Sequence, residues 1–229
     1  MSQLSETDAA RSPLWTARSL HRRVEPARAP FRATKDAAKR LGGTLNTAFL
    51  TAAADAASAY HIEMGAPTES LRASMAISTR TEESGANAFS LARLLVPTGE
   101  MPIDERFLAI HEATQTLRES SKAAGLDTLA AVTSALPTSL ITRLARQQSQ
   151  TVDFATSNVK GSPQAMYIAG SKLAAIYPAG PLGGVAFNLT LMSYLGSLDM
   201  GLHVDPAAVT DPRMLADCLD DAFRELIAT

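Results

Sequence analysis

The spacing of apolar residues predicts helices over much of the chain. From Thr44 to Gly65, apolar residues recur at intervals of three and four, which is typical of a helix with one face on a core. Asp211 followed by Pro212 is a favoured helix start, and an apolar stripe continues from there to the C-terminus. Helices are therefore expected over 32–41, 44–65, 102–123, 127–135, 137–148 and 211–229.

Short apolar runs bounded by glycine, proline or polar residues predict strands, and most of them fall in the last third of the chain. The expected strands are 20–26, 71–78, 89–97, 153–158, 165–170, 171–178, 184–196 and 197–205. The first of these has the character of an edge strand. Helices early and strands late indicate an α/β fold of the α+β kind, in which helices pack on a mixed β-sheet.

The composition is typical of a chain that folds around an apolar core, and the net charge limits the classes of binding partner. The 229 residues are 46% hydrophobic and 19% charged, with a net charge of −2, which does not favour nucleic-acid binding. Residues 1–40 carry nine Lys or Arg and four acidic residues, so this segment has a net charge of +5. Such a segment suits a membrane surface, a phosphate or an acidic protein, or it is simply a solvated surface.

No apolar run reaches the length of a membrane span, and the first residues have no apolar core of a secretory signal. The single cysteine leaves no internal disulfide and no cysteine-based zinc cluster. The expected location is therefore cytoplasmic, with a peripheral membrane contact as an extension of the basic segment.

Single residues with catalytic potential lack the neighbours that catalysis needs. Cys218 lies on the apolar stripe of the last helix, which favours a packed thiol over a nucleophile. The four histidines have no metal-ligand spacing, so no metal site is expected. His61 lies near a helix C-terminus, where a cation is favoured. His203 and Asp205 form a candidate base and orienting acid, although residues two apart on a strand need not orient one another.

Polar residues inside the late strands are a stronger signal. Ser157 and Asn158 end one apolar run, and Asn188 and Thr190 interrupt another. A buried polar side chain without a partner costs about 1–3 kcal/mol. These residues therefore either hold neighbouring loops or line a pocket in which a substrate completes the hydrogen bonding.

Several short motifs follow one another in a fixed order: LGGTLN (41–46), RASMAISTR (72–80), GANAFSLARLLVP (85–97), SNVKGSP (157–163), Tyr177-Pro178, Asn188-Leu189-Thr190, Ser193-Tyr194 and Leu198-Asp199. Together they resemble the C-terminal region of the bacterial wax ester synthase/diacylglycerol acyltransferase family, over nearly the whole chain. The resemblance implies the two-lobed, chloramphenicol acetyltransferase-like fold. It also implies acyl transfer from acyl-CoA, as a substrate rather than a cofactor, to a long-chain alcohol or diacylglycerol.

In that family the general base belongs to a His-His-x-x-x-Asp-Gly motif of the N-terminal lobe, and this sequence has no counterpart. The polar segment 1–12 is expected to be flexible. The resemblance implies a C-terminal lobe over 13–229, in which Pro13-Leu14-Trp15 marks the start of the lobe. It implies no catalytic residue in this chain and little activity alone. The substrate-side residues that it implies, along one wall of a tunnel between the lobes, are Asn46, Ser157, Asn158, Asn188, Thr190 and Ser193.

The expected partner is an N-terminal lobe on another chain, or else the chain forms a homo-oligomer. Two alternatives stay open: a non-catalytic module that binds acyl-CoA or lipid, and a purely structural interaction subunit. The chain also departs from the family at two positions. Thr47 replaces an aspartate after Asn46, and Lys160 replaces a proline after Val159.

Overall fold

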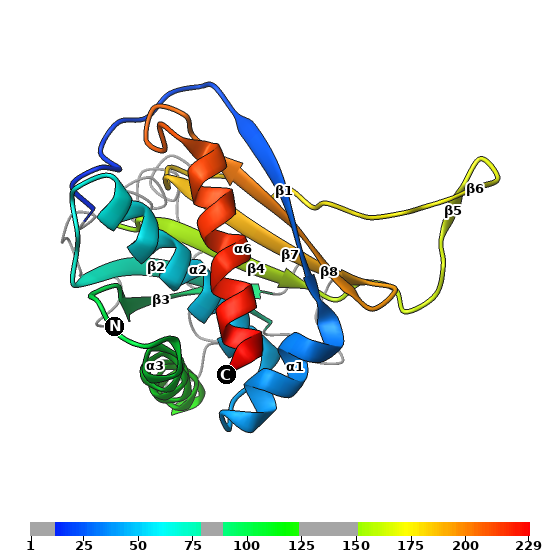
Figure 1. Cartoon of the computed structure of the whole chain (residues 1–229), viewed down its shortest axis with the longest axis horizontal. Coiled ribbons are helices and arrows are strands. Elements are labelled where there is room, and N and C mark those ends of the chain that lie inside the picture. The colour runs from blue at the N-terminus through cyan, green and yellow to red at the C-terminus, as the bar shows by residue number, and fades with distance from the viewer. Residues whose placement is uncertain (1–11, 79–88, 124–150) are drawn as a thin grey trace, which may run out of the picture.

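The computed structural model describes residues 12–78, 89–123 and 151–229 (Figure 1). Its main sheet has six strands in the order β1-β8-β7-β4-β2-β3. Strand β4 runs parallel to both of its neighbours, whereas the other pairs are antiparallel. The six strands are β1 (Arg23–Pro30), β2 (Ser70–Ser78), β3 (Phe89–Pro97), β4 (Phe154–Val159), β7 (Phe187–Tyr194) and β8 (Ser197–Val204). This mixed sheet confirms the predicted fold class.

Helices cover one face of the sheet, and Figure 1 shows α2 and α6 lying in front of it. The described helices are α1 (Phe31–Arg40), α2 (Leu45–Glu63), α3 (Ile103–Ala123) and α6 (Pro212–Ala228). Helix α2 is buried on nearly all sides, because it lies between the sheet and the neighbouring helices. One apolar core joins these layers, and Phe154 stacks on Phe187 within it at a centroid distance of 4.8 Å.

Most of the predicted elements are confirmed to within a few residues. The prediction of a strand over 171–178 was wrong, because only Ser171–Lys172 pair, as β6 with β5 (Tyr167–Ile168). The rest of that segment finds side-chain partners instead of a strand: Tyr194 Oη donates to the Leu173 carbonyl, and Ile176 N–H donates to Asp199 Oδ2. The helices predicted over 127–135 and 137–148 lie outside the described residues.

The start of the described chain is held by buried polar groups. Ser12 N–H donates to Asp153 Oδ1 at 3.0 Å, and the Ser12 hydroxyl contacts His61 Nε2 at 2.8 Å. Trp15 is buried against Phe187 with its ring edge on, at a centroid distance of 5.4 Å. The packed part of the lobe therefore includes Ser12.

Candidate functional site

Two of the predicted site residues meet at the open end of β4. Asn158 Nδ2 donates to Asn46 Oδ1 at 3.5 Å, although the two residues are 112 positions apart in the sequence. Asn46 Nδ2 in turn donates to the Met75 sulfur at 2.7 Å, which fixes the orientation of the amide from the side of β2. Asn158 itself is exposed, so its amide is accessible to a ligand.

The start of α2 positions Asn46. The chain enters the helix through Gly42, which has a left-handed φ of 77°, and through Gly43, where a Cβ would lie 2.5 Å from the Phe107 ring. Thr44 accepts a hydrogen bond from Thr47 N–H, and Thr47 Oγ1 accepts one from Thr44 N–H. Thr47 thus closes a capping box at the position where the family has an aspartate.

The first turn of α2 contains no acidic residue. The partial positive charge of the helix N-terminus is therefore not neutralised by its own side chains. This end of the helix lies beside Asn158, so the open end of β4 combines an amide donor with a favourable field for negative charge.

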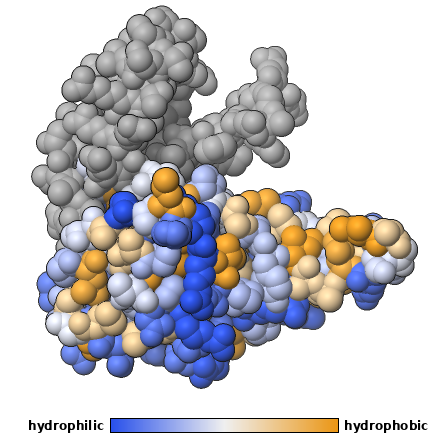
Figure 2. All heavy atoms as spheres, turned by 90° about the horizontal axis from the view of Figure 1, so that it is seen from above, coloured by the Kyte–Doolittle hydropathy of each residue, from blue (hydrophilic) through white to orange (hydrophobic). Residues whose placement is uncertain are grey.

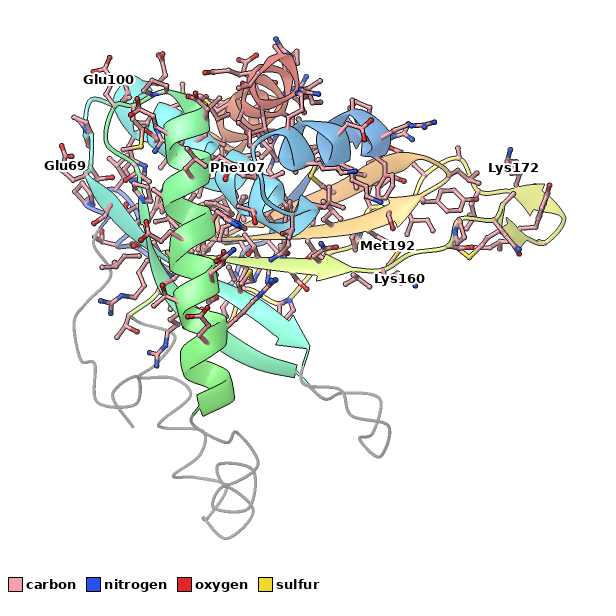
Figure 3. All side chains as sticks on the ribbon, turned by 90° about the horizontal axis from the view of Figure 1, so that it is seen from below. Glu69, Glu100, Phe107, Lys160, Lys172 and Met192 are labelled. Carbon is pink, nitrogen blue, oxygen red and sulfur yellow. The ribbon has the colours of Figure 1, made fainter. Side chains whose placement is uncertain are left out.

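The chain leaves β4 in close contact with β7 (Figure 3). Gly161 N–H donates to Ser193 Oγ at 3.3 Å, and a Cβ at position 161 would lie 1.9 Å from the Ser193 carbonyl oxygen. Ser193 thus holds the segment that follows Asn158. Lys160, the residue that replaces the family proline, is exposed at this exit.

The other predicted residues lie on the opposite face of the sheet. Ser157 is in register with Thr190 on β7. Thr190 Oγ1 donates to Asn188 Oδ1 at 2.9 Å, and Asn188 Nδ2 donates to the Pro181 carbonyl at 2.8 Å. His203 contacts the Gly180 carbonyl through Nδ1 at 2.7 Å. Asn188 and His203 therefore hold the segment 176–182 against this face, and the predicted set is divided between two faces.

The other candidates take structural roles. Asp205 accepts hydrogen bonds from Ser19, and these hold the pKa of its carboxyl below the ordinary value despite burial, so His203 and Asp205 do not form a pair. Burial raises the pKa of the Cys218 thiol to about 11. His61 lies near the C-terminus of α2, where a cation is favoured, but burial lowers its pKa.

One buried group was missed by reading the sequence. The Asp153 carboxylate accepts hydrogen bonds from Ser12 N–H and from Arg72 N–H, and thereby joins the N-terminal segment to β2. The signal for it was a charged residue at the start of a buried strand. Among the residues that the structure describes, no three His, Cys, Asp or Glu side chains are grouped so that they could hold a metal ion. No helix in the described ranges is long and apolar enough to cross a membrane.

Comparison with known proteins identifies relatives over nearly the whole chain. The family model for the WS/DGAT C-terminal domain matches residues 85–227. A Mycobacterium tuberculosis protein named as a diacylglycerol O-acyltransferase is 31% identical over 219 residues, which are 95% of this chain and 44% of that protein. Another from the same species is 29% identical over 225 residues, covering 92% of this chain and 46% of the relative. The chain thus spans less than half the length of these relatives.

Solved structures show the same fold. The wax ester synthase/diacylglycerol acyltransferase from Marinobacter aquaeolei VT8 superposes with a TM-score of 0.71 at 24% identity, over 98% of this chain and 53% of that one. The epimerization domain of tyrocidine synthetase B has a TM-score of 0.59 at 13% identity, over 98% and 52% of the two chains. With the family model and the mycobacterial relatives, the chain belongs to the wax ester synthase/diacylglycerol acyltransferase family, of which it forms the C-terminal domain.

Proposed function

We propose that this chain is the C-terminal half of an acyl-CoA-dependent O-acyltransferase that acts on a lipid alcohol, either a long-chain alcohol or diacylglycerol. Family membership and the names of the relatives support the reaction class. The coverage of 44% of the mycobacterial relative supports a missing N-terminal half. That half would supply the general base for the acceptor hydroxyl.

The observation that carries the proposal is the contact between Asn158 and Asn46 at the N-terminus of α2. When an alcohol attacks the thioester carbonyl, the carbonyl oxygen gains negative charge before the CoA thiol leaves. A preorganised donor for that oxygen contributes about 2.7–4 kcal/mol where it has been measured in other enzymes. The exposed Asn158 amide, held by Asn46 beside a positive helix end with no acidic residue in its first turn, fits this task.

The remaining predicted residues would position this donor or the tunnel wall. Ser193 fixes the segment after Asn158 through Gly161, while Asn188 and Thr190 fix the far face. Ser157 is half-buried and lies directly before Asn158, so a contact with the substrate remains part of the proposal. The basic residues of segment 11–40 would hold the lobe near an anionic membrane surface, where its substrates partition.

An acyl transfer assay tests the proposal. The full chain is co-expressed with the part of the 31%-identical mycobacterial relative that it does not cover, and transfer from palmitoyl-CoA to hexadecanol and to dioleoylglycerol is measured. We expect turnover with both halves and none with either half alone. Absence of turnover from a stable complex of the two halves would contradict the proposal.

The same experiment separates the alternatives. Saturable binding of palmitoyl-CoA by the chain alone, without turnover in the complex, would indicate a non-catalytic acyl-CoA-binding module. A stable complex with neither binding nor turnover would indicate a structural subunit.

A further inference from the structure

A short segment at the start of the described chain lies across one end of the lobe. Residues 12–19 run outside the sheet, between the end of α2 and the start of β1 (dark blue in Figure 1). Ser12 and Trp15 are buried, whereas Thr16 and Arg18 are exposed. Figure 2 views the lobe from this side and shows hydrophilic atoms across the centre of the surface. Among the described residues the segment is thus an outer layer, and detaching it breaks only its own contacts.

Two carboxylates hold the segment at its two ends. Ser12 N–H donates to Asp153 Oδ1 at 3.0 Å, directly before β4. Ser19 N–H donates to Asp205 Oδ2 at 2.7 Å, and the Ser19 hydroxyl donates to Asp205 Oδ1 at 2.6 Å, directly after β8. The segment therefore ties together the ends of two strands, and Ser12 makes a further contact with α2.

The Ser12 hydroxyl is fully used by its neighbours. Its oxygen accepts hydrogen bonds from Leu14 N–H at 3.2 Å and from Trp15 N–H at 3.0 Å, which occupies both lone pairs. Its proton is therefore left for His61 Nε2, which lies 2.8 Å away. His61 Nδ1 lies 2.7 Å from the Ala57 carbonyl oxygen, so Nδ1 carries the ring proton and donates. These contacts fix His61 in its neutral form, with Nε2 as the acceptor.

A second proton on His61 has no place in this arrangement. It would bind to Nε2 and face the Ser12 proton, because the Ser12 oxygen already accepts two other hydrogen bonds. The ring is also fully buried, with the Trp15 ring at a centroid distance of 4.4 Å, so water does not solvate an imidazolium here. Burial accordingly lowers the pKa of His61.

The charged groups around the ring do not reverse this effect. The Asp153 carboxylate favours protonation of His61, but it is a weaker influence than burial. Arg18, on the segment itself, interacts with both Asp153 and Asp205. On α2, the Tyr60 hydroxyl contacts the residues directly before α6. Burial therefore decides the charge of His61 as long as the segment is closed.

We propose that the contact between Ser12 and His61 is a pH-sensitive switch, which keeps residues 12–19 closed on the lobe while His61 is neutral and releases them when His61 takes up a proton. The switch is a property of the lobe itself and does not rest on the proposed acyl transfer. In the released form the ring is solvated and regains its ordinary pKa of about 6.5. Below that pH the released form binds one proton more than the closed form, so the ratio of closed to released molecules falls by about tenfold per pH unit.

Release of the segment changes one end of α2. Trp15 packs against Tyr60 and Phe187 at centroid distances of 6.1 and 5.4 Å, so its departure uncovers apolar surface between α2 and β7. The first turn of the same helix carries Asn46 of the candidate site, whereas His61 lies near its C-terminus. The switch thus acts on the helix that positions Asn46, at the end opposite to the site.

Amide hydrogen exchange tests the switch, because the closed segment protects several of its own N–H groups. Those of Ser12, Leu14, Trp15 and Ser19 are hydrogen-bonded to side chains in the closed form. Exchange of the full chain is followed by mass spectrometry at pH 7 and at pH 5.5, and each rate is divided by that of an unstructured peptide at the same pH. Peptides from β8 report on the folded sheet.

The wild type is compared with two variants. His61→Gln puts a side chain without a titrating group at the switch. Ser19→Ala is the matched control, because it loosens the same segment at Asp205 and leaves the contact between Ser12 and His61 in place. Circular dichroism at pH 7 verifies that both variants fold.

We expect the protection of residues 12–19 to fall by about tenfold from pH 7 to pH 5.5 in the wild type and in Ser19→Ala, and to stay constant in His61→Gln. The protection of β8 should not change. A fall of less than about twofold in the wild type, or an equal fall in His61→Gln, would overturn the proposal. An equal fall in β8 would also overturn it, because acid would then unfold the whole lobe.

A second variant keeps the test decisive if His61→Gln does not fold. Ser12→Ala removes the hydroxyl proton that faces His61 Nε2, so the closed segment accepts a protonated ring more readily. Its protection should therefore fall less between pH 7 and pH 5.5 than that of the wild type. An equal fall would overturn the role of Ser12 in the switch.

Discussion

Gly161 has no room for a methyl group, which gives a quantitative test of how the site segment is held. Its φ lies outside the left-handed region, so space alone decides the outcome of Gly161→Ala. The new Cβ would lie 1.9 Å from the Ser193 carbonyl oxygen and 2.8 Å from Met192 Cγ. The nearer atom is main chain of a central strand and cannot turn aside. The segment after Asn158 must therefore move by roughly 1 Å, as overpacked sites do.

Such overpacking costs about 1–3 kcal/mol. With a urea dependence of about 3 kcal/mol per molar for a chain of this size, the midpoint of urea unfolding should fall by roughly 0.3–1 M. In the assembled enzyme, a displacement of about 1 Å at the site should also reduce kcat by about 100-fold. The assay is urea unfolding followed by far-UV circular dichroism, and then acyl transfer in the complex.

The matched control is Gln164→Ala, three residues further along the same segment, where the side chain is exposed. Its midpoint should stay within the small range that surface substitutions cause. If Gly161→Ala unfolds at the same urea concentration as this control, the close contact with β7 is refuted.

Three further predictions follow from buried groups. Burial lowers the pKa of His61, so this side chain is neutral in the fold and takes up a proton on unfolding below its ordinary pKa of about 6.5. Stability present above that pH should be lost as the pH falls below it, and His61→Gln should flatten the fall in melting temperature between pH 7 and 5, whereas a fall as steep as that of the wild type would contradict this. With a pKa of about 11, the Cys218 thiol should react with Ellman's reagent at pH 8 only when the protein unfolds, and rapid reaction of the folded chain would contradict this. Asn188→Ala should cost about 1–3 kcal/mol in urea unfolding, because it leaves the Pro181 carbonyl without its donor, and an unchanged midpoint would refute that role.

Elements with strong local signals could be predicted from the sequence. The boundaries of α2 follow from the glycines before it, the Thr44 cap and the apolar spacing, all of which lie within the segment itself. The start of α6 follows in the same way from Asp211, which accepts a hydrogen bond from Met214 N–H. These signals act over a few residues and do not depend on the rest of the fold.

The wrong prediction of a strand over 171–178 shows what a local sequence pattern cannot predict. An apolar, alternating run becomes a strand only if another strand lies beside it, and that depends on the fold as a whole. Here Tyr194 and Asp199, from later strands, supply hydrogen bonds to Leu173 and Ile176, and after Ser171–Lys172 the segment joins no described strand. Tyr194 and Asp199 can be read from the sequence, but their proximity to this segment cannot.

The candidate site was only partly predictable, for the same reason. The polar residues in the late strands indicated either residues that hold loops or residues that line a pocket. Asn188 holds a loop, because its amide donates to the Pro181 carbonyl in the segment 176–182. Asn158 was indicated by the polar end of its apolar run, whereas Asn46 entered only through the family resemblance, because no local signal joins residues 112 positions apart. Which face each residue occupies follows from strand alternation once the register of β4 on β7 is known.

The turnover number of the assembled enzyme carrying Asn158→Ala tests the central claim most directly. Asn158 is exposed, so the substitution should leave the melting temperature of the chain unchanged. If its amide stabilises the oxyanion, kcat should fall by about 100- to 1,000-fold relative to the wild-type complex. A kcat equal to that of the wild type, in a complex of the same stoichiometry, would contradict the assignment of the site.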